Sequence, residues 1–353
     1  MSPQQYTRRD LLRHSAAGAG FLAIGSLAGC SDILGGDESN QNASESVPSR
    51  ADVVVSVDAQ EILDDDDLRD LVDVALEEIQ QFGGGETDLP EDVDAAIEMA
   101  QQEADLDPTG FQQGTLFMQL EDDDVDEEYA GVIMETDWAE EELVGVLESE
   151  GDNDLEESEY NGTTLYSEPD TDDGGMAVLS EGQYVIGSTE VLEDVIDVVN
   201  GDGDAIDSEL ADMYDETTDG HMQFATVVPE GTLEDMDTEE IEIESLDQIE
   251  YTSGSVYKTD SAYGVETSMW AGDAASQLKE DIEFAIDAAS RMDDTSEEVK
   301  RRLEDVQVET TDQTVTASYE EDIEQVKAAA ETYIEENIMG LLFLLAFGGG
   351  TTT

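Results

Sequence analysis

An excess of acidic side chains constrains this chain more than any other feature of its sequence. Its 353 residues include 93 Asp and Glu but only 12 Lys and Arg, which gives a formal net charge of -81 at pH 7. Repulsion of this size opposes a compact state in dilute buffer. Near 1 M salt the screening length falls to about 3 Å, so that only close charges still repel one another. We therefore expect the folded state to depend on concentrated salt.

This acidic composition, in which lysine is scarce, resembles that of proteins from extreme halophiles. An acidic disordered chain is the alternative, because high net charge with few apolar residues is its usual signature. Regularly spaced apolar residues along most of the chain favour a folded protein. Nucleic acid is excluded as a partner, because the sequence has no basic patch to neutralise phosphates. The four lysines are Lys258, Lys279, Lys300 and Lys327.

The first thirty residues indicate export and lipid attachment. Arg8 and Arg9 precede a weakly apolar run rich in Gly and Ala, which is typical of twin-arginine export signals. The run ends in Leu-Ala-Gly-Cys at Cys30, which resembles the lipobox of exported lipoproteins, where cleavage before the Cys leaves a thiol that receives lipid. We therefore expect a signal peptide over 1–29 and a lipidated, flexible tether over 30–49. A chance cysteine in an uncleaved apolar helix is the alternative.

Cysteine and histidine are too scarce for several kinds of site. Cys30 is the only cysteine, so a disulfide framework and a thiolate metal site are both excluded. Loss of the signal would remove His14 and leave His221 alone, which excludes a two-histidine zinc site. A Ser-His-Asp triad would have to use His221, for which a structural or surface role is the alternative. The sequence therefore predicts no catalytic residue and no metal site.

Two acidic turns look like calcium loops but do not follow the EF-hand order. Residues 170–175 place Gly174 at the fifth position, and residues 200–204 are followed by Ala205 where the turn glycine is required. No cofactor is predicted beyond weak binding of Ca²⁺, Mg²⁺ or Na⁺ by surface carboxylates, and a solvated acidic turn is the simpler interpretation. Residues 83–85 lack the lysine that follows a phosphate-binding loop.

Two asparagines lie in N-glycosylation sequons. Asn42 begins Asn-Ala-Ser within the tether, and Asn161 begins Asn-Gly-Thr within the folded body. Asn161-Gly162 also lies between two strand-like runs, where Asn-Gly is a typical hairpin turn. The two interpretations of Asn161 are compatible.

Residues 50–218 have the pattern of a first α+β unit. A strand leads into two helices inserted over 60–104, then into a hairpin, a helix and further strands. Asp137 and Glu140 have the spacing of a capping box and predict the start of a helix. Asn200-Gly201 predicts the end of a later helix. The expected strands are 52–58, 115–120, 129–136, 160–167, 176–179 and 183–187.

Residues 219–337 repeat this order as strand, hairpin, helix, hairpin and helix. Trp138 and Trp270 fall at corresponding points, each between a strand and an acidic helix. Two large core anchors are the alternative to a duplication. The predicted fold class is α+β, with two related units of mainly antiparallel sheet and helices packed on one face. The expected strands of the second unit are 221–228, 249–258, 262–269, 306–310 and 314–319.

One segment carries a family resemblance. It contains Tyr160-Asn161-Gly162, a second hairpin that ends in Val185-Ile186-Gly187, and a helix closed by Gly201. With these motifs, residues 160–201 resemble a family of uncharacterised exported proteins of bacteria and archaea. The motifs are a turn and the start of a helix, so the resemblance implies a local fold and no catalytic residue.

Residues 338–353 form an apolar C-terminal tail. As a helix, the run Ile338–Phe347 would be about 15 Å long, half of a hydrocarbon core of about 30 Å. A transmembrane span is therefore not expected. We expect the run either to pack on the body or to contact membrane or a partner protein, because such a segment rarely stays in water without a role.

The sequence thus predicts a lipid-anchored protein of a halophilic archaeon, on the extracytoplasmic face of the cell membrane. Its predicted role is non-enzymatic binding or scaffolding, with the membrane as a partner through Cys30. Two alternatives stay open, namely a solute-binding lipoprotein of an importer and a hydrolase that uses carboxylates or a divalent ion. A ligand between the two units would favour the importer, and a convergent acid cluster in a cleft would favour the hydrolase.

Overall fold

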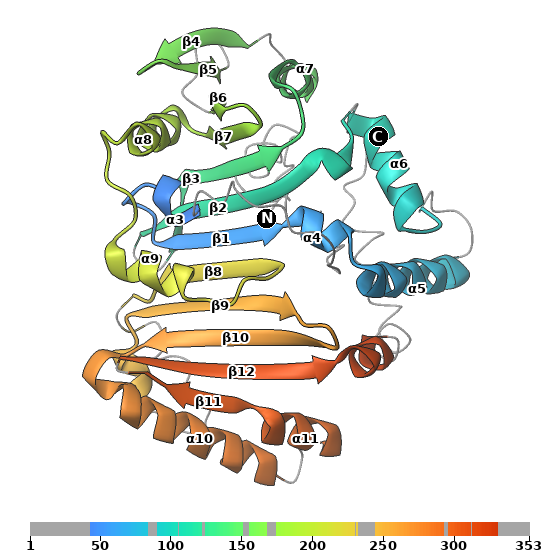
Figure 1. Ribbon diagram of the computed structural model, residues 1–353, viewed down its shortest axis with the longest axis vertical. Helices are drawn as coiled ribbons and strands as arrows, with labels where there is room; N and C mark the ends of the chain where they lie inside the picture. Colours follow the sequence, from blue (N-terminus) through green and yellow to red (C-terminus); the bar gives the residue numbers. More distant parts are fainter. Residues whose placement is uncertain are drawn as a thin grey trace, which may run out of the picture.

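The β-branched run Val53–Asp58 forms strand β1, near the centre of a 12-stranded sheet in the computed structural model (Figure 1). The strand order is β11-β12-β10-β9-β8-β1-β2-β3-β7-β6-β5-β4, and neighbouring strands are antiparallel. The structure describes residues 43–83, 90–104, 106–121, 124–150, 155–167, 174–229, 231, 244–292, 296–311 and 313–330.

The remaining strands alternate with helices along the chain. The strands are β2 (Phe111–Glu121), β3 (Asp124–Thr136), β4 (Glu156–Tyr160), β5 (Thr163–Ser167), β6 (Gly175–Ser180), β7 (Gln183–Gly187), β8 (Met222–Val227), β9 (Tyr251–Lys258), β10 (Ala262–Trp270), β11 (Gln307–Thr310) and β12 (Thr314–Asp322). The helices are α3 (Ala43–Ser46), α4 (Ala59–Leu63), α5 (Asp66–Gly83), α6 (Val93–Ala104), α7 (Glu140–Glu150), α8 (Thr189–Asn200), α9 (Ser208–Asp215), α10 (Ala275–Arg291) and α11 (Glu297–Asp305). A C-terminal helix begins at Ile323 and is described to Ala330.

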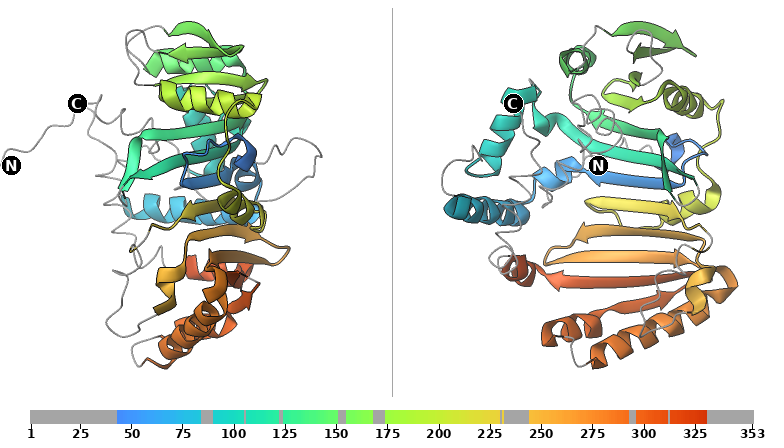
Figure 2. Two further views of the ribbon diagram at one scale, coloured as in Figure 1. Left: turned by 90° about the vertical axis from the view of Figure 1, so that its left-hand side faces the viewer. Right: turned by 180° about the vertical axis from the view of Figure 1, so that it is seen from behind.

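Outward from the β1–β8 pair, the sheet has the same order of strands in both directions. One half runs β1-β2-β3-β7-β6 and continues with β5 and β4, and the other runs β8-β9-β10-β12-β11. After the third strand, α7 leads through the hairpin β4–β5 to the returning pair β6–β7, and α10 leads through α11 to the returning pair β11–β12. Strand β1 pairs with β8 from Val53 to Val57, so the sheet is continuous between the two predicted units (Figure 2). This order agrees with a duplication, which itself stays a prediction.

Helices cover both faces of the first half of the sheet. In β3, Ile133 packs toward α8 and α9, whereas its neighbours Val132 and Met134 pack toward α7. Successive residues of a strand point to opposite faces, so these three side chains lie in two separate cores. The α+β class and the antiparallel sheet agree with the prediction, but the helices lie on both faces instead of one. Both faces need cover because the central strands are apolar at successive positions.

Two local predictions are confirmed at the turns of the first half. Asn161 and Gly162 join β4 to β5 with φ angles of 47° and 89°, the left-handed values that a two-residue hairpin turn requires. Helix α8 ends at Asn200, and Gly201 follows with a φ of 77°. Glycine adopts this conformation without a steric penalty, which explains why the helix stops there.

The predicted capping box at Asp137 and Glu140 is wrong. Helix α7 begins at Glu140, and the Glu142 carboxylate accepts the Ala139 backbone N–H at 2.9 Å. Asp137 instead accepts a hydrogen bond from Gln112 Nε2 at 2.8 Å, which holds its side chain at the end of the sheet. A tertiary contact has therefore displaced the start of the helix. The short helices α9 and α11 were not expected from the sequence.

Several sequence predictions lie outside the described residues. These are the export signal with Arg8 and Arg9, the lipidated Cys30, the sequon at Asn42 and the apolar tail. In the part of the chain that the structure describes, no helix is both long enough and apolar enough to span a membrane.

Candidate functional site

A buried ion pair joins the helices of the first half to the strands of the second. Asp65, between α4 and α5, is fully buried, and its Oδ1 lies 2.7 Å from Nζ of Lys258 at the end of β9. The Tyr263 hydroxyl donates to Asp65 Oδ2 at 2.6 Å. Because a buried carboxylate needs both a counter-charge and hydrogen bonds, this arrangement is typical of a structural clamp.

The clamp continues onto the C-terminal helix. Nζ of Lys327 lies 2.8 Å from Asp67 and 3.1 Å from Asp70, and Lys258 also reaches Asp67 at 2.9 Å. The hydrogen bond from Lys327, together with that from Lys258, holds the pKa of Asp67 below its ordinary value. Two of the four lysines of the chain are thus engaged in joining α5 to the second half.

His221 lies beside this clamp and is buried. Its Nδ1 lies 3.0 Å from Glu61 Oε2, and its ring meets the Tyr263 ring edge-on at 6.3 Å. Within the described chain, His221 Nε2 has no hydrogen-bond partner, so the described residues place no serine hydroxyl where a triad would need one. Of the two roles considered for this histidine, the geometry agrees with the structural one.

Two half-buried carboxylates lie in one row of the sheet. Asp58 of β1 pairs with Gln113 of β2, and Gln113 in turn pairs with Glu135 of β3. Burial raises the pKa of both carboxyls, and the charge of Asp58 raises the pKa of Glu135 further. Among the described residues, no group of three or more His, Cys, Asp or Glu side chains could hold a metal ion.

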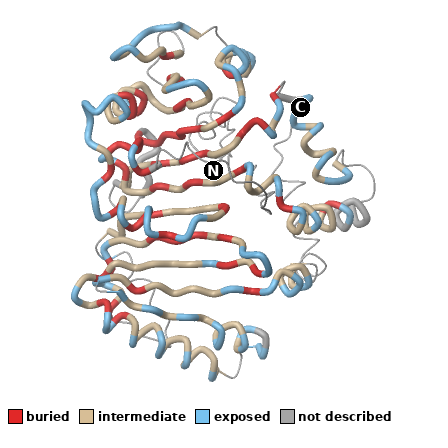
Figure 3. The backbone as a smooth tube through the Cα atoms, viewed as in Figure 1, coloured by how far each residue is buried: buried red, intermediate tan, exposed pale blue. Residues whose placement is uncertain are grey.

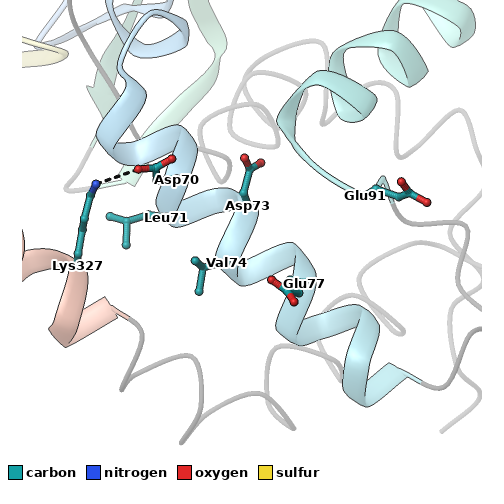
Figure 4. Close-up of a pocket in the computed structure, with 7 residues that line it drawn as sticks. All are labelled: Asp70, Leu71, Asp73, Val74, Glu77, Glu91 and Lys327. Carbon is teal, nitrogen blue, oxygen red and sulfur yellow. Dashed lines mark hydrogen bonds and ion pairs between the residues drawn. The ribbon is translucent and has the colours of Figure 1, made fainter.

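An acidic groove of about 450 Å³ lies along α5 (Figure 4). In this view Lys327 reaches Asp70 from the C-terminal helix, and Leu71 and Val74 lie between the charged side chains. Asp73 is already engaged, because it accepts the Val93 N–H at the start of α6 at 2.8 Å. The groove is therefore an acidic surface whose single cation is already paired. It is lined by Asp70, Leu71, Asp73, Val74, Glu77, Glu91 and Lys327.

A second pocket, of about 520 Å³, opens at the opposite end of the strands of the second half. We call it the Trp270 pocket. Trp270 is the last residue of β10, and the short helix Gly272–Ala274 follows it. The pocket is open to solvent, because its four polar side chains, those of Gln248, Glu250, Asp273 and Gln313, are exposed. The pocket is lined by Gln248, Glu250, Trp270, Ala271, Gly272, Asp273, Ala274 and Gln313.

Backbone hydrogen bonds hold the walls of the Trp270 pocket together. The N–H of Glu250 donates to the Trp270 carbonyl at 3.0 Å, and the N–H of Ala271 donates to the Gln313 carbonyl at 2.9 Å. The Glu250 carbonyl accepts the Val228 N–H at 2.8 Å. Three chain segments are thereby fixed relative to one another, so the pocket exists before any ligand binds, which lowers the free-energy cost of binding.

The side chains of the pocket leave their polar groups available. Trp270 meets Tyr251 edge-on at 5.8 Å, but within the described chain its indole N–H makes no hydrogen bond. The side-chain amides of Gln248 and Gln313 also make no hydrogen bond within the described chain, and both residues are exposed. Gly272 has a φ of 52° and places no side chain at the end of the indole ring, where an added Cβ would lie 3.7 Å from the ring. An aromatic face with free amides and carboxylates around it can bind a ligand.

Trp138, in the first half of the sheet, differs from Trp270 in having a hydrogen bond from its indole N–H and a stacked neighbour. Its Nε1 donates to the Asp107 carbonyl at 2.7 Å, and its ring stacks on Phe111 at 5.9 Å. Both tryptophans were considered as core anchors from the sequence, and this role suits Trp138. For Trp270 the sequence contained only a weak signal, the Gly272 that follows shortly after it. The pocket needs residues from three chain segments, which local patterns do not bring together.

Of the site residues predicted from the sequence, Asn161 lies in the described part of the chain, and it is far from the Trp270 pocket. Asn161 is exposed in the β4–β5 turn at the other edge of the sheet, and its Nδ2 donates to Asp197 at 2.7 Å. Arg8, Arg9, Cys30 and Asn42 lie outside the described residues. None of the residues predicted from the sequence is therefore part of the Trp270 pocket.

The sequence matches no protein-family model and no curated protein. Among solved structures, the chain is similar to crystal form III of TP0453, with a TM-score of 0.42 and 7% identity over 84% of this chain and 100% of that chain. For crystal form I of TP0453 the TM-score is 0.40 and the identity 10%, over 82% of this chain and 96% of that chain. Likenesses at this level carry over no residue role and no function.

Proposed function

We propose that this chain is a lipid-anchored binding protein of a halophilic archaeon, held on the extracytoplasmic face of the cell membrane, with no enzymatic role. The observation that supports binding is the Trp270 pocket, whose backbone is tied in place while its polar side chains are free. The anchor is proposed from the sequence, through the twin-arginine motif and the lipobox cysteine Cys30. The acidic composition supports the halophilic setting.

The layout of the sheet favours this proposal over an importer's solute-binding protein. A solute-binding protein of two lobes closes on its ligand around a hinge. Here the β1–β8 pairing makes both halves parts of one sheet, and the clamp of Asp65 and Lys258 joins them a second time. The Trp270 pocket lies within the second half, not between the halves.

The anchoring part of the proposal is tested by localisation. Cys30→Ser should release the protein to the medium or leave it in an uncleaved membrane form, because no thiol receives lipid. Arg8→Lys combined with Arg9→Lys should retain it in the cytoplasm, because the twin-arginine route reads this pair. Wild-type localisation of both variants would contradict the anchor. The Gln60→Ala variant, on the exposed surface of α4, serves as the control.

The tail Ile338–Phe347 is proposed as a second contact with membrane or protein. Deleting residues 338–353 in the Cys30→Ser background should weaken the residual membrane association and leave thermal unfolding nearly unchanged. A large drop in the unfolding temperature would show instead that the tail belongs to the core.

The binding part is tested by purifying the lipoprotein from native membranes in molar salt. Mass spectrometry of the co-purified small molecules and proteins should find a species that is retained by the wild type and lost from Trp270→Ala. Identical sets of retained species in the two preparations would contradict a binding role for the pocket.

A further inference from the structure

We propose that the Trp270 pocket binds a neutral saccharide, stacked on the indole of Trp270. This inference rests on the proposed function, since it names the ligand class of the same pocket.

The indole of Trp270 provides a flat apolar platform. Trp270 is half-buried, its ring meets Tyr251 edge-on at 5.8 Å, and Gly272 places no side chain at the end of the ring. An aromatic face carries partial negative charge, and the weakly positive C–H groups on one face of a pyranose ring complement it. The charge distribution of a sugar ring therefore complements that of the indole face.

The side chains around the platform suit the hydroxyl groups of a sugar. Gln248 and Gln313 each supply an amide that can donate and accept hydrogen bonds, and Glu250 and Asp273 supply acceptors. A sugar hydroxyl is at once a donor and an acceptor, so this mixed set can bond to several hydroxyls in turn. The four side chains are exposed, so they surround an open site that an extended glycan chain can cross.

Charge discriminates between ligand classes. Two carboxylates in the pocket and a net charge of -81 oppose an anionic ligand. A cationic amine would be attracted, but near 1 M salt a screening length of about 3 Å removes most of that attraction at exposed groups. Stacking and hydrogen bonding do not depend on net charge, so a neutral ligand gains most from this pocket under the conditions in which the protein is expected to fold.

The chain offers a direct spectroscopic test, because it contains only two tryptophans. In the Trp138→Phe variant, Trp270 is the sole indole and reports on its own pocket. The lipoprotein in molar KCl should be titrated with soluble oligomers of glucose, mannose and N-acetylglucosamine. We expect at least one series to shift the Trp270 emission to shorter wavelength and to saturate. Binding of short oligomers would identify a free sugar as the source, whereas retention on immobilised polymer alone would identify a surface glycan.

Variants test the assigned contacts by calorimetry with the sugar that binds. Trp270→Ala should reduce affinity more than tenfold, and Gln313→Ala several-fold, whereas Gln60→Ala should leave it unchanged. Trp270→Phe, which keeps an aromatic face, should bind with intermediate affinity. Equal affinity of Trp270→Ala and wild type would overturn the proposal.

Two other results would also overturn the saccharide assignment. One is saturation of the Trp270 emission by tetramethylammonium with no response to any sugar, which would indicate a cation site. The other is the absence of any response to either class, together with no retention on the immobilised polymers. If the membrane preparation still contains a ligand that depends on Trp270, the binding function survives and only its ligand class is rejected.

Discussion

The two halves of the sheet share one order of strands but differ in how helices cover them. In the first half, α8 buries four apolar side chains against one face, while α7 covers the other face. In the second half, α10 buries only Ala275 and Leu278, and its Phe284 is 63% exposed. The buried segments in Figure 3 accordingly concentrate in the first half. Equal topology therefore does not imply an equal core.

One row of the sheet explains the difference. From Val54 this row runs through Phe117 to Gly131 and Gly187. A Cβ added at either glycine would lie 2.6 Å from a methyl of Val191 in α8. The two glycines therefore let α8 approach the strands closely. In the other direction, the same row reaches Ser268 and Thr316, whose hydroxyls bond to each other at 2.8 Å. A helix gains nothing apolar by packing on that second surface.

The C-terminal helix shows the consequence. It follows β12 as α8 follows β7, but the ion pairs of Lys327 hold it at α5. The chemistry of one sheet face has thus decided where an equivalent helix lies. The comparison teaches that the strand pattern sets the topology, while the residues of each face set the layers.

The largest expected effect comes from breaking the clamp between the halves. Lys258→Met should lower the free energy of unfolding by about 3–5 kcal/mol, because it removes the ammonium that pairs with the fully buried Asp65. Thermal unfolding followed by circular dichroism in molar KCl would measure it. Lys279→Met, which removes an exposed pair with Glu283, is the matched control and should cost about 0–1 kcal/mol. Equal losses would show that the clamp does not join the halves.

The next effect compares the two cores. Leu192 and Leu278 are both fully buried leucines, in α8 and α10 respectively. Leu192→Ala should cost about 2–5 kcal/mol, because the dense core around α8 cannot close over the cavity. Leu278→Ala should cost less, since α10 contacts a smaller cluster and can shift toward the strands. A greater loss for Leu278→Ala in a denaturant titration would refute the comparison.

The tryptophans give a smaller contrast. Trp138→Phe removes the hydrogen bond to the Asp107 carbonyl and should cost about 1 kcal/mol. Trp270→Phe removes an indole N–H that has no partner within the described chain, and should leave stability nearly unchanged. Unfolding midpoints of the two variants in the same salt would test this, and the reverse order would argue that Trp270 is the core anchor.

The smallest expected effect concerns Glu135, whose contribution to folding stability changes with pH. Burial and the charge of Asp58 raise its pKa above 4.5, so the folded protein binds this proton more readily than the unfolded chain does. Its contribution to folding therefore grows as pH falls through the raised pKa and is lost above it. Glu135→Gln should be more stable than wild type by about 0.5 kcal/mol at neutral pH, with screening limiting the gain.

The pH series supplies the test for Glu135. The advantage of Glu135→Gln should vanish once the pH has fallen through the raised pKa, because wild type is then protonated as well. Glu309→Gln, on an exposed position of β11, is the control and should show no such dependence. A constant difference at all pH values would mean that the carboxyl charge is not the cause.

Much of the secondary structure could be predicted from the sequence, because its signals act over a few residues. Asn161-Gly162 specifies its turn by left-handed φ angles, and Gly201 ends α8 in the same way. Short helices such as Ser208–Asp215 were missed because about two turns carry too little periodicity to stand out. The start of α7 was misplaced because Gln112, from a neighbouring strand, competes for Asp137.

The sequence by itself determined the charge, the exclusion of cysteine and two-histidine sites, and the order of the strands and the longer helices. The tertiary structure decided that the halves share one sheet, that helices cover both faces, and that Asp65 meets Lys258. It also decided that Trp270 borders a pocket while Trp138 is anchored. The physical reason is that a turn or a helix end is stabilised by its immediate neighbours. Layers, ion pairs and pockets instead depend on which distant strands pair and in what register, and a local pattern does not contain that information.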